Sequence, residues 1–172
     1  MADRIPWTER TFDFGFPVGL YHEILERIRG TPARVEELVR AVPKEIMTRR
    51  DGNAWSIQEN VGHLLDVEEL WLGRLDDYDH GAQALRPADM TNRQTHAARH
   101  NEKPIESILS AFRRERIKLV RRLEQLEPDR FGQTATHPRL GQPMRIVDMM
   151  YFVAEHDDYH LARITELTRK LR

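Results

Sequence analysis

Apolar residues recur at a helical spacing of about 3.6 along four long segments of the chain. No segment alternates between apolar and polar residues for long enough to indicate a half-buried strand. The four segments are similar in length, so helices built from them can pack side by side around one core. The pattern predicts an all-α fold, a four-helix bundle that forms a single domain over residues 1–172, with helices at about 17–43, 56–79, 104–127 and 144–171.

Local signals support these helix positions. Ser56 and Glu59 form a capping-box motif at the start of the second segment. In the first segment the apolar positions keep their phase across Gly30-Thr31-Pro32, so we expect one bent helix or two nearly coaxial helices, ending at Pro43. Pro104 favours the start of the third helix, because proline is well tolerated in a first turn.

Two connections are longer than antiparallel neighbours need, at about 80–103 and 128–144. Connections of this length often cover a functional site. In the N-terminal arm, aromatic residues alternate with polar residues between Phe12 and Phe16, after Trp7. We expect this arm to lie extended against the bundle rather than to form a sheet.

Composition narrows the possible functions. The 172 residues include 27 lysines and arginines against 28 aspartates and glutamates, and the net charge of −1 argues against a nucleic-acid partner. The chain shows no apolar run long enough for a membrane span and no secretory leader pattern, so we expect a cytoplasmic protein. With no cysteine, the chain has no disulfide, no thiolate ligand and no cysteine nucleophile. The eight histidines are therefore the main candidates for chemistry.

The fourth segment carries polar residues on its core face. His156 and His160 are spaced i and i+4, so both imidazoles can reach one metal ion, and Asp157 also points inward. A third ligand must come from another helix, and His63 borders the apolar face of the second segment beside Gly62, which permits close helix approach. By spacing alone, a metal site and a set of hydrogen-bonded core histidines remain equally open.

Two more charges fall at inward positions, Glu68 in the second segment and Arg116 in the third. Because an unpaired buried charge is costly, these side chains should pair with each other or line a polar pocket. Asp66 is expected on a solvated face, and Trp55 and Trp71 are expected to be packing residues.

The other histidines are weaker candidates. His22 lies opposite the apolar stripe of its helix, and His80 lies at a helix end. His96 and His100 form a rival i, i+4 pair, but no apolar periodicity would hold them rigidly. His137 is expected in a turn.

Five motifs span nearly the whole chain: Arg29 to Arg34, Trp55-Ser56-Ile57, Gly62-His63-Leu64, His137-Pro138 with Gly141, and Glu155 to Ala162. Together they resemble the motifs of the DinB-like superfamily of four-helix metalloproteins, which includes bacillithiol-dependent S-transferases. The resemblance implies a bundle that is often a homodimer, with His63, His156 and His160 binding one divalent metal ion, most often zinc or nickel.

The resemblance further implies an enzyme that transfers a low-molecular-weight thiol to a small electrophilic substrate, as in detoxification under stress. Three protein ligands leave a position open for catalysis. Arg116, or alternatively Arg139 and Arg163, could hold the carboxylates of such a thiol. A metal-dependent hydrolase with Asp157 or Glu68 as base or orienting group is the alternative, and so is a noncatalytic bundle in which the metal only joins helices.

Overall fold

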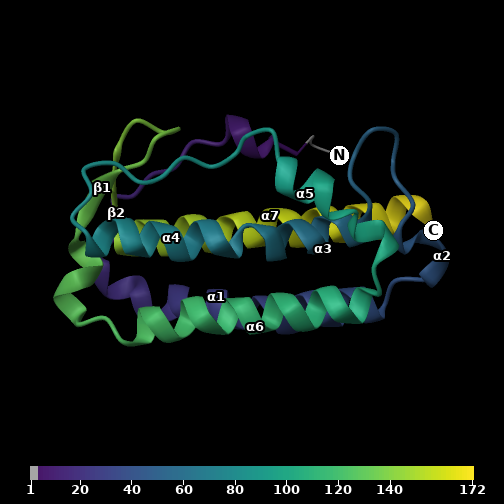
Figure 1. The fold of residues 1–172 in the computed structure, drawn as a ribbon, viewed down its shortest axis with the longest axis horizontal. Coiled ribbons are helices and arrows are strands. Elements are labelled where there is room, and N and C mark those ends of the chain that lie inside the picture. Colours follow the sequence, from purple (N-terminus) through teal and green to yellow (C-terminus); the bar gives the residue numbers. More distant parts are fainter. Residues whose placement is uncertain (1–3) are drawn as a thin grey trace.

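The computed structural model describes residues 4–172. The predicted all-α four-helix bundle is confirmed (Figure 1). Its long helices are α1 (Tyr21–Arg40), α3 (Ile57–Asp66) with α4 (Glu68–Asp79), α6 (Ile105–Glu124) and α7 (Ile146–Leu171).

The helices form a ring in which α1 packs on α7 and α6, and the α3–α4 pair packs on the same two helices. In Figure 1, α4 ends at the opposite end of the bundle from the start of α6, so the connection between them returns along the whole bundle. This explains the length of the 80–103 connection. It also makes α6 run parallel to its neighbour α4, instead of antiparallel as a short loop would require.

The two connections carry structure that the sequence pattern did not predict. The first contains α5 (Arg93–Ala98), and the second contains the antiparallel strands β1 (Thr134–Thr136) and β2 (Pro143–Arg145). Strands of three residues are too short to show an alternating pattern. The remaining short elements are α2 (Lys44–Met47) and the 3-10 turns Trp7–Glu9, Val18–Leu20, His100–Glu102 and Pro128–Gly132.

The second predicted helix is interrupted at Val67, between α3 and α4. The amide of Val67 still donates to the His63 carbonyl at 3.2 Å, and the Trp71 amide donates to the Val67 carbonyl at 3.2 Å. The i to i−4 bonding therefore continues through the interruption, and α3 and α4 act as one helix with a local distortion.

The first predicted helix runs as one helix through Pro32. A proline inside a helix cannot donate to the carbonyl four residues earlier, which here belongs to Ile28. The buried Arg116 guanidinium on α6 donates to that carbonyl, with 3.1 Å between Nη1 and the oxygen. A side chain from a neighbouring helix thus replaces the hydrogen bond that the proline removes.

The core consists of two apolar clusters, one around Leu75 and Phe152 and one around Val61 and Leu161. No helix within residues 4–172 contains an 18-residue stretch apolar enough to cross a membrane. The clusters meet near the middle of the bundle, where each long helix contributes buried polar side chains. These are Thr31 on α1, His63 and Glu68 on α3–α4, Arg116 on α6, and His156, Asp157 and His160 on α7.

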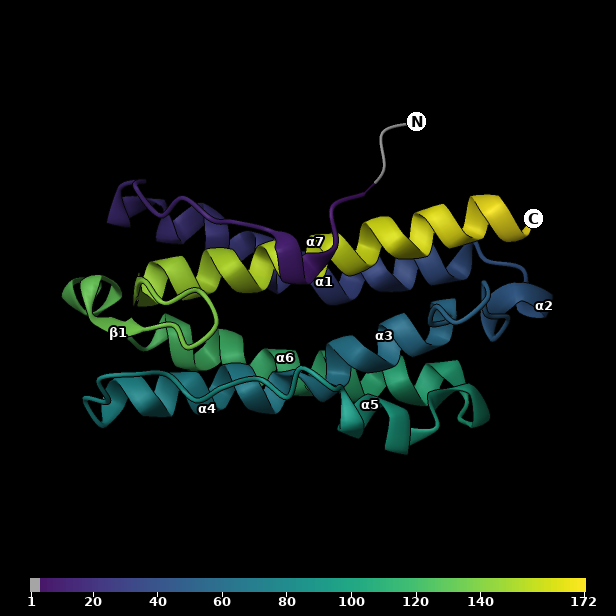
Figure 2. The ribbon, with the colours of Figure 1, turned by 90° about the horizontal axis from the view of Figure 1, so that it is seen from above.

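From residue 4 onward, the N-terminal arm lies extended along the bundle, as predicted, and this part of it forms no strand (Figure 2). Its half-buried aromatic side chains alternate with exposed residues from Thr11 to Phe16. Trp7 packs edge-on against Phe152 and His156 of α7, at ring-centroid distances of 4.9 and 5.1 Å. The arm therefore covers the part of α7 that carries the histidines.

Candidate metal centre

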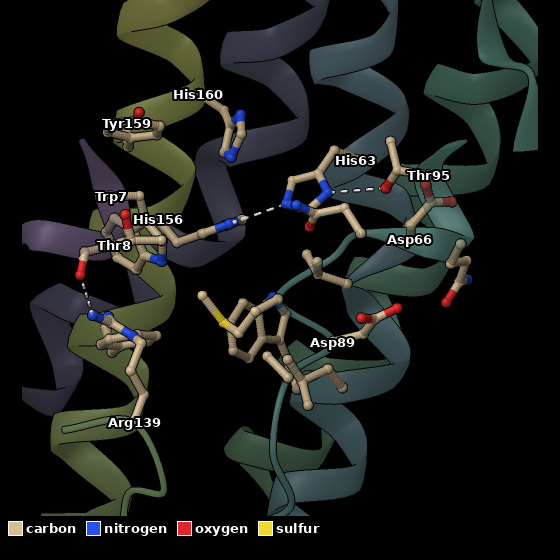
Figure 3. Close-up of a pocket in the computed structure, with 18 of the residues that line it drawn as sticks. Trp7, Thr8, His63, Asp66, Asp89, Thr95, Arg139, His156, Tyr159 and His160 are labelled. Atoms are coloured by element: carbon tan, nitrogen blue, oxygen red, sulfur yellow. Dashed lines mark hydrogen bonds between the residues drawn. The ribbon is translucent and has the colours of Figure 1, made fainter. Parts of the chain in front are cut away.

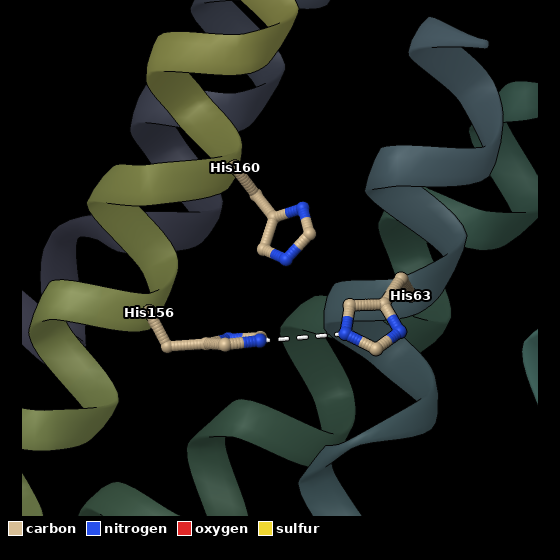
Figure 4. A group of neighbouring side chains, drawn as sticks. All are labelled: His63, His156 and His160. Carbon is tan, nitrogen blue, oxygen red and sulfur yellow. Dashed lines mark hydrogen bonds between the residues drawn. The ribbon is translucent and has the colours of Figure 1, made fainter. Parts of the chain in front are cut away.

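Three histidines converge in the polar middle of the bundle (Figure 4). His63 comes from α3, and His156 and His160 come from successive turns of α7. One ligand nitrogen from each lies within 4.8 Å of the other two, and the Nε2 atoms of His63 and His156 are 3.3 Å apart. Two nitrogens bound tetrahedrally to zinc at 2.0–2.1 Å lie about 3.4 Å apart. The arrangement therefore fits a single divalent metal ion.

Neighbouring side chains orient two of the three rings. His160 Nδ1 lies 2.9 Å from the Asn60 side-chain oxygen, while the Asn60 amide nitrogen donates to the Ser56 carbonyl at 2.7 Å. Asn60 therefore accepts from Nδ1 and leaves Nε2 of His160 free as a ligand. His63 Nδ1 contacts the Thr95 hydroxyl of α5 at 3.0 Å (Figure 3). No motif in the sequence marked Asn60 or Thr95 as a site residue.

All three rings are buried, and burial favours the neutral imidazole that binds metal. Burial lowers the pKa of His63 to about 4 and lowers the pKa values of His156 and His160 well below 6.5. Nδ1 of His156 is buried and has no hydrogen-bond partner among residues 4–172. Three neutral nitrogen donors without a carboxylate are a chemically reasonable set for zinc or nickel.

The histidines line the wall of a cavity of about 920 Å³ that opens to the surface. Its walls come from the N-terminal arm, α3–α4, the 80–103 connection, the loop after β1 and α7. Figure 3 shows His63, His156 and His160 grouped together, with Trp7 and Arg139 on the side of His156. A small molecule in this cavity can therefore reach the open side of the histidine site.

The buried charges form a separate cluster next to the site. Arg116 pairs with Glu68 at 2.6 Å and with Asp157 at 3.0 Å, and Thr31 donates to Asp157 at 2.7 Å. Burial raises the pKa of Glu68, although Arg116 pulls it in the opposite direction. The cluster joins all four long helices, and the predicted pairing of Glu68 with Arg116 is confirmed.

None of Glu68, Arg116 and Asp157 lines the cavity. Every nitrogen of the Arg116 guanidinium is already bonded to a carboxylate or a carbonyl, so the expected contact of Arg116 with a cofactor does not fit this placement. Asp157 and Glu68 also lack the access that a catalytic base needs. Their placement fits the orientation of the helices that carry the histidines.

The remaining candidate residues are either bonded to neighbouring groups or exposed. Arg163 lines the cavity, but it pairs with Glu166 at 2.7 Å. His137 accepts two backbone amides in its turn, as expected. His22, His80 and His96 are exposed.

The rival pair of His96 and His100 does not form a ligand set among the described residues. Instead, His100 is buried and contacts Asp66 at 2.8 Å, so Asp66 is not the free solvated carboxylate that the sequence suggested. A Cβ atom at Gly62 would lie only 2.2 Å from the His100 ring. Gly62 thus permits a close approach, but the segment that approaches it is the 80–103 connection, through His100, and not another helix of the bundle.

The three histidines, which come from two helices of the bundle and face a cavity, form a candidate metal-binding site. The sequence matches the DinB superfamily over residues 27–164, and the chain belongs to this superfamily. No curated protein matches the chain in sequence.

Solved structures show the same fold. One is YfiT from Bacillus subtilis, which is described as a probable metal-dependent hydrolase with an unusual four-helix bundle topology. YfiT is 18% identical to this chain, with a TM-score of 0.76, and the match covers 94% of this chain and 93% of YfiT. The colibactin self-resistance protein ClbS, solved in complex with double-stranded DNA, is 14% identical with a TM-score of 0.65, covering 87% and 95%. A Streptococcus pneumoniae protein is 11% identical with a TM-score of 0.64, covering 91% of each chain.

Proposed function

We propose that this protein is a metal-dependent enzyme acting on a small molecule bound in the cavity. The observation that carries the proposal is the convergence of His63, His156 and His160 at the cavity wall, with no fourth protein ligand among the described residues. A divalent metal ion held there would act as a Lewis acid and lower the pKa of a bound thiol or water, so that it reacts as a nucleophile near neutral pH.

The chain's own residues would hold and shield the reacting groups. Asn60 and Thr95 contact Nδ1 of His160 and of His63, so that Nε2 of each ring would be free to hold the ion. Trp7 and Trp71 pack edge-on against His156, at centroid distances of 5.1 and 5.6 Å, and restrict water on that side. Glu68, Arg116 and Asp157 would hold together the helices that carry the histidines. They would act as positioning residues rather than as catalytic bases.

Transfer of a low-molecular-weight thiol to an electrophile is our first candidate reaction. The cavity of about 920 Å³ has room for a thiol and a second small molecule, and a chain without cysteine must take its thiol from outside. Hydrolysis is the second candidate, favoured by the description of YfiT as a probable metal-dependent hydrolase. Arg163, at the cavity wall, is a candidate for holding a thiol's carboxylate.

Other properties stay predictions. We expect zinc or nickel as the metal, a homodimer, and a cytoplasmic protein with a role in stress response. The net charge of −1 led us to expect no nucleic-acid partner, but ClbS has been solved with double-stranded DNA, so this expectation needs its own binding test.

The decisive experiment is elemental analysis of protein purified without a tag or chelator. We expect about one divalent ion per chain in the wild type and little in His63→Ala, His156→Ala or His160→Ala. His96→Ala, an exposed histidine of the rival pair, is the matched control and should keep its metal. Full metal content in His156→Ala would refute the site.

Turnover then separates the two candidate reactions. The metal-loaded protein would be given L-cysteine with monochlorobimane, to detect thiol transfer, and p-nitrophenyl acetate, to detect hydrolysis. Histidine-dependent conjugation supports transfer, and histidine-dependent ester cleavage without conjugation supports hydrolysis. Neither activity in a fully loaded protein would favour a noncatalytic bundle.

A further inference from the structure

The cavity contains two arginines that have no carboxylate partner among residues 4–172, Arg74 on α4 and Arg139 in the loop after β1. The other cavity-lining arginines are all paired: Arg4 and Arg163 with Glu166, and Arg86 with Asp77. An unpaired charge in a buried position is costly, which calls for a reason to keep it.

Arg74 is the more buried of the two, at 1% exposure. Its Nε donates to the Arg86 carbonyl at 3.3 Å, and its guanidinium lies 5.4 Å from the centre of the Trp71 ring. Nη1 is buried without a hydrogen-bond partner in the described chain. Burial lowers the pKa of Arg74 to about 10, so the side chain is still charged at neutral pH. Asp77, the nearby carboxylate, accepts hydrogen bonds from the backbone amide of Arg86 and from two nitrogens of its guanidinium.

Arg139 lines the same cavity from the loop after β1. Its Nη1 donates to the Thr8 carbonyl at 3.2 Å, which Figure 3 shows, and its guanidinium lies 5.7 Å from the centre of the Phe152 ring. Nη2 is buried and has no partner within residues 4–172. The cation is therefore anchored at one nitrogen and leaves a second nitrogen free to donate.

His137 adds a third free donor. Its Nδ1 accepts the amides of Arg139 and Leu140 at 3.2 Å each, so in the neutral ring the proton is on Nε2. Nε2 is buried and has no partner in the described structure. Phe152 links the three groups, because its ring centre lies 5.0 Å from that of His137, 5.7 Å from the Arg139 guanidinium and 6.2 Å from that of Trp71, which Arg74 contacts. Burial and the charges of Arg74 and Arg139 lower the pKa of His137 to about 3.

We propose that Arg74, Arg139 and His137 form an oxyanion-binding subsite that holds a carboxylate or phosphate group of the substrate. Guanidinium groups and an imidazole N–H match the lone pairs of such a group, and the low-dielectric surroundings strengthen the contact. Trp71 joins the subsite to the histidines, because it contacts both the Arg74 guanidinium and the His156 ring.

The inference deepens the proposed function and rests on it for the reacting end of the substrate. A substrate anchored by its anionic group at Arg74 and Arg139 would extend past Trp71 and present its reactive carbon to the histidine site. The substrate class is thus a small organic acid or phosphate ester. Arg163, which its pairing with Glu166 already neutralises, is not required for this anchoring.

The test measures anion binding by chelator-treated protein, so that the metal plays no part. Inorganic phosphate and acetate would be titrated by calorimetry at constant ionic strength into wild type, Arg74→Met, Arg139→Met and Arg113→Met. The last is the matched control, because Arg113 pairs with Glu36 on an exposed face. We expect binding to weaken by about tenfold or more in the first two variants and to stay unchanged in the control.

The two anions distinguish the sources of the oxyanion, and binding of either supports the subsite. Equal affinity in wild type and Arg74→Met would overturn the proposal, and so would loss of binding in Arg163→Met but not in Arg74→Met. Far-UV circular dichroism checks folding, and Arg74→Lys, which keeps the charge, should recover part of the affinity. Failure of the metal site remains distinguishable, since His156→Ala should lose metal yet keep anion binding.

Discussion

Arg116 and Arg74 are buried to the same extent, at 1% exposure each, but their surroundings differ. Arg116 bonds to two carboxylates and a backbone carbonyl, and each of its nitrogens has a partner. Arg74 bonds to one carbonyl at 3.3 Å and keeps a buried nitrogen without a partner in the described chain. Burial alone therefore does not assign a role to a charged side chain. A satisfied charge belongs to the architecture, whereas an unsatisfied one facing a cavity indicates a ligand.

The largest expected effect is at Arg116. Replacing Arg116 with methionine would leave the buried carboxylates of Glu68 and Asp157 without their main partner, at a cost of about 3–5 kcal/mol in the free energy of unfolding. Urea denaturation at pH 7.5 measures this loss. Arg113→Met breaks an exposed pair instead and should cost about 1 kcal/mol or less. If both variants lose the same amount, the view of Arg116 as an architectural residue is wrong.

The second prediction concerns acid stability and His137. Its pKa is about 3 in the folded protein, against about 6.5 when unfolded, because of burial and the charges of Arg74 and Arg139. The unfolded chain therefore binds more protons between these pH values. The stabilisation that this group contributes is complete above pH 6.5 and is lost as the pH falls towards 3.

His137→Asn tests this, because the asparagine oxygen can accept the same two backbone amides but does not titrate. Between pH 6.5 and 4, the variant's free energy of unfolding should fall less steeply than that of the wild type. In Arg74→Met the slope should also be shallower, since one cause of the lowered pKa is gone. Identical slopes in all three proteins would separate His137 from the arginines and weaken the proposed subsite.

The third prediction is that replacing Arg74 stabilises the folded protein, whereas replacing Arg116 destabilises it. Arg74→Met removes a charge with no carboxylate partner and should raise the free energy of unfolding by about 1–2 kcal/mol. The same urea experiment compares it with Arg116→Met. A loss of stability at Arg74 would mean that a structural contact, and not a ligand, keeps this arginine in place.

The sequence predicted the buried charges that have hydrogen-bond partners better than it predicted the residues of the proposed anion subsite. Periodicity placed Glu68 and Arg116 on inward faces, and the cost of buried charge then required them to pair. His156 and His160 were visible because an i, i+4 pair on an apolar stripe is a local pattern. These residues could be found from the pattern of a single helix, or from the general cost of burying an unpaired charge.

The missed features depend on contacts between distant segments. Thr95 lies on α5, whose six residues have no apolar periodicity and begin after Asn92 in a left-handed conformation. This helix is held in place when the His100 ring packs on Gly62, a contact that no local pattern reveals. The proposed subsite was missed for the same reason, because Arg74 and Arg139 come to line one cavity only once the fold is complete.

The smallest expected effect is at Thr31, which belongs to the same buried cluster as Arg116 and Asp157. Thr31 donates to Asp157 at 2.7 Å, but Asp157 also accepts from Arg116 at 3.0 Å, so Thr31→Val removes one of several bonds to the carboxylate. Valine keeps the shape of threonine, and the expected loss is about 1 kcal/mol. Urea denaturation beside Arg116→Met gives the ratio of the two effects. A loss at Thr31 as large as the loss at Arg116 would mean that the hydroxyl, rather than the guanidinium, is what satisfies the buried carboxylate.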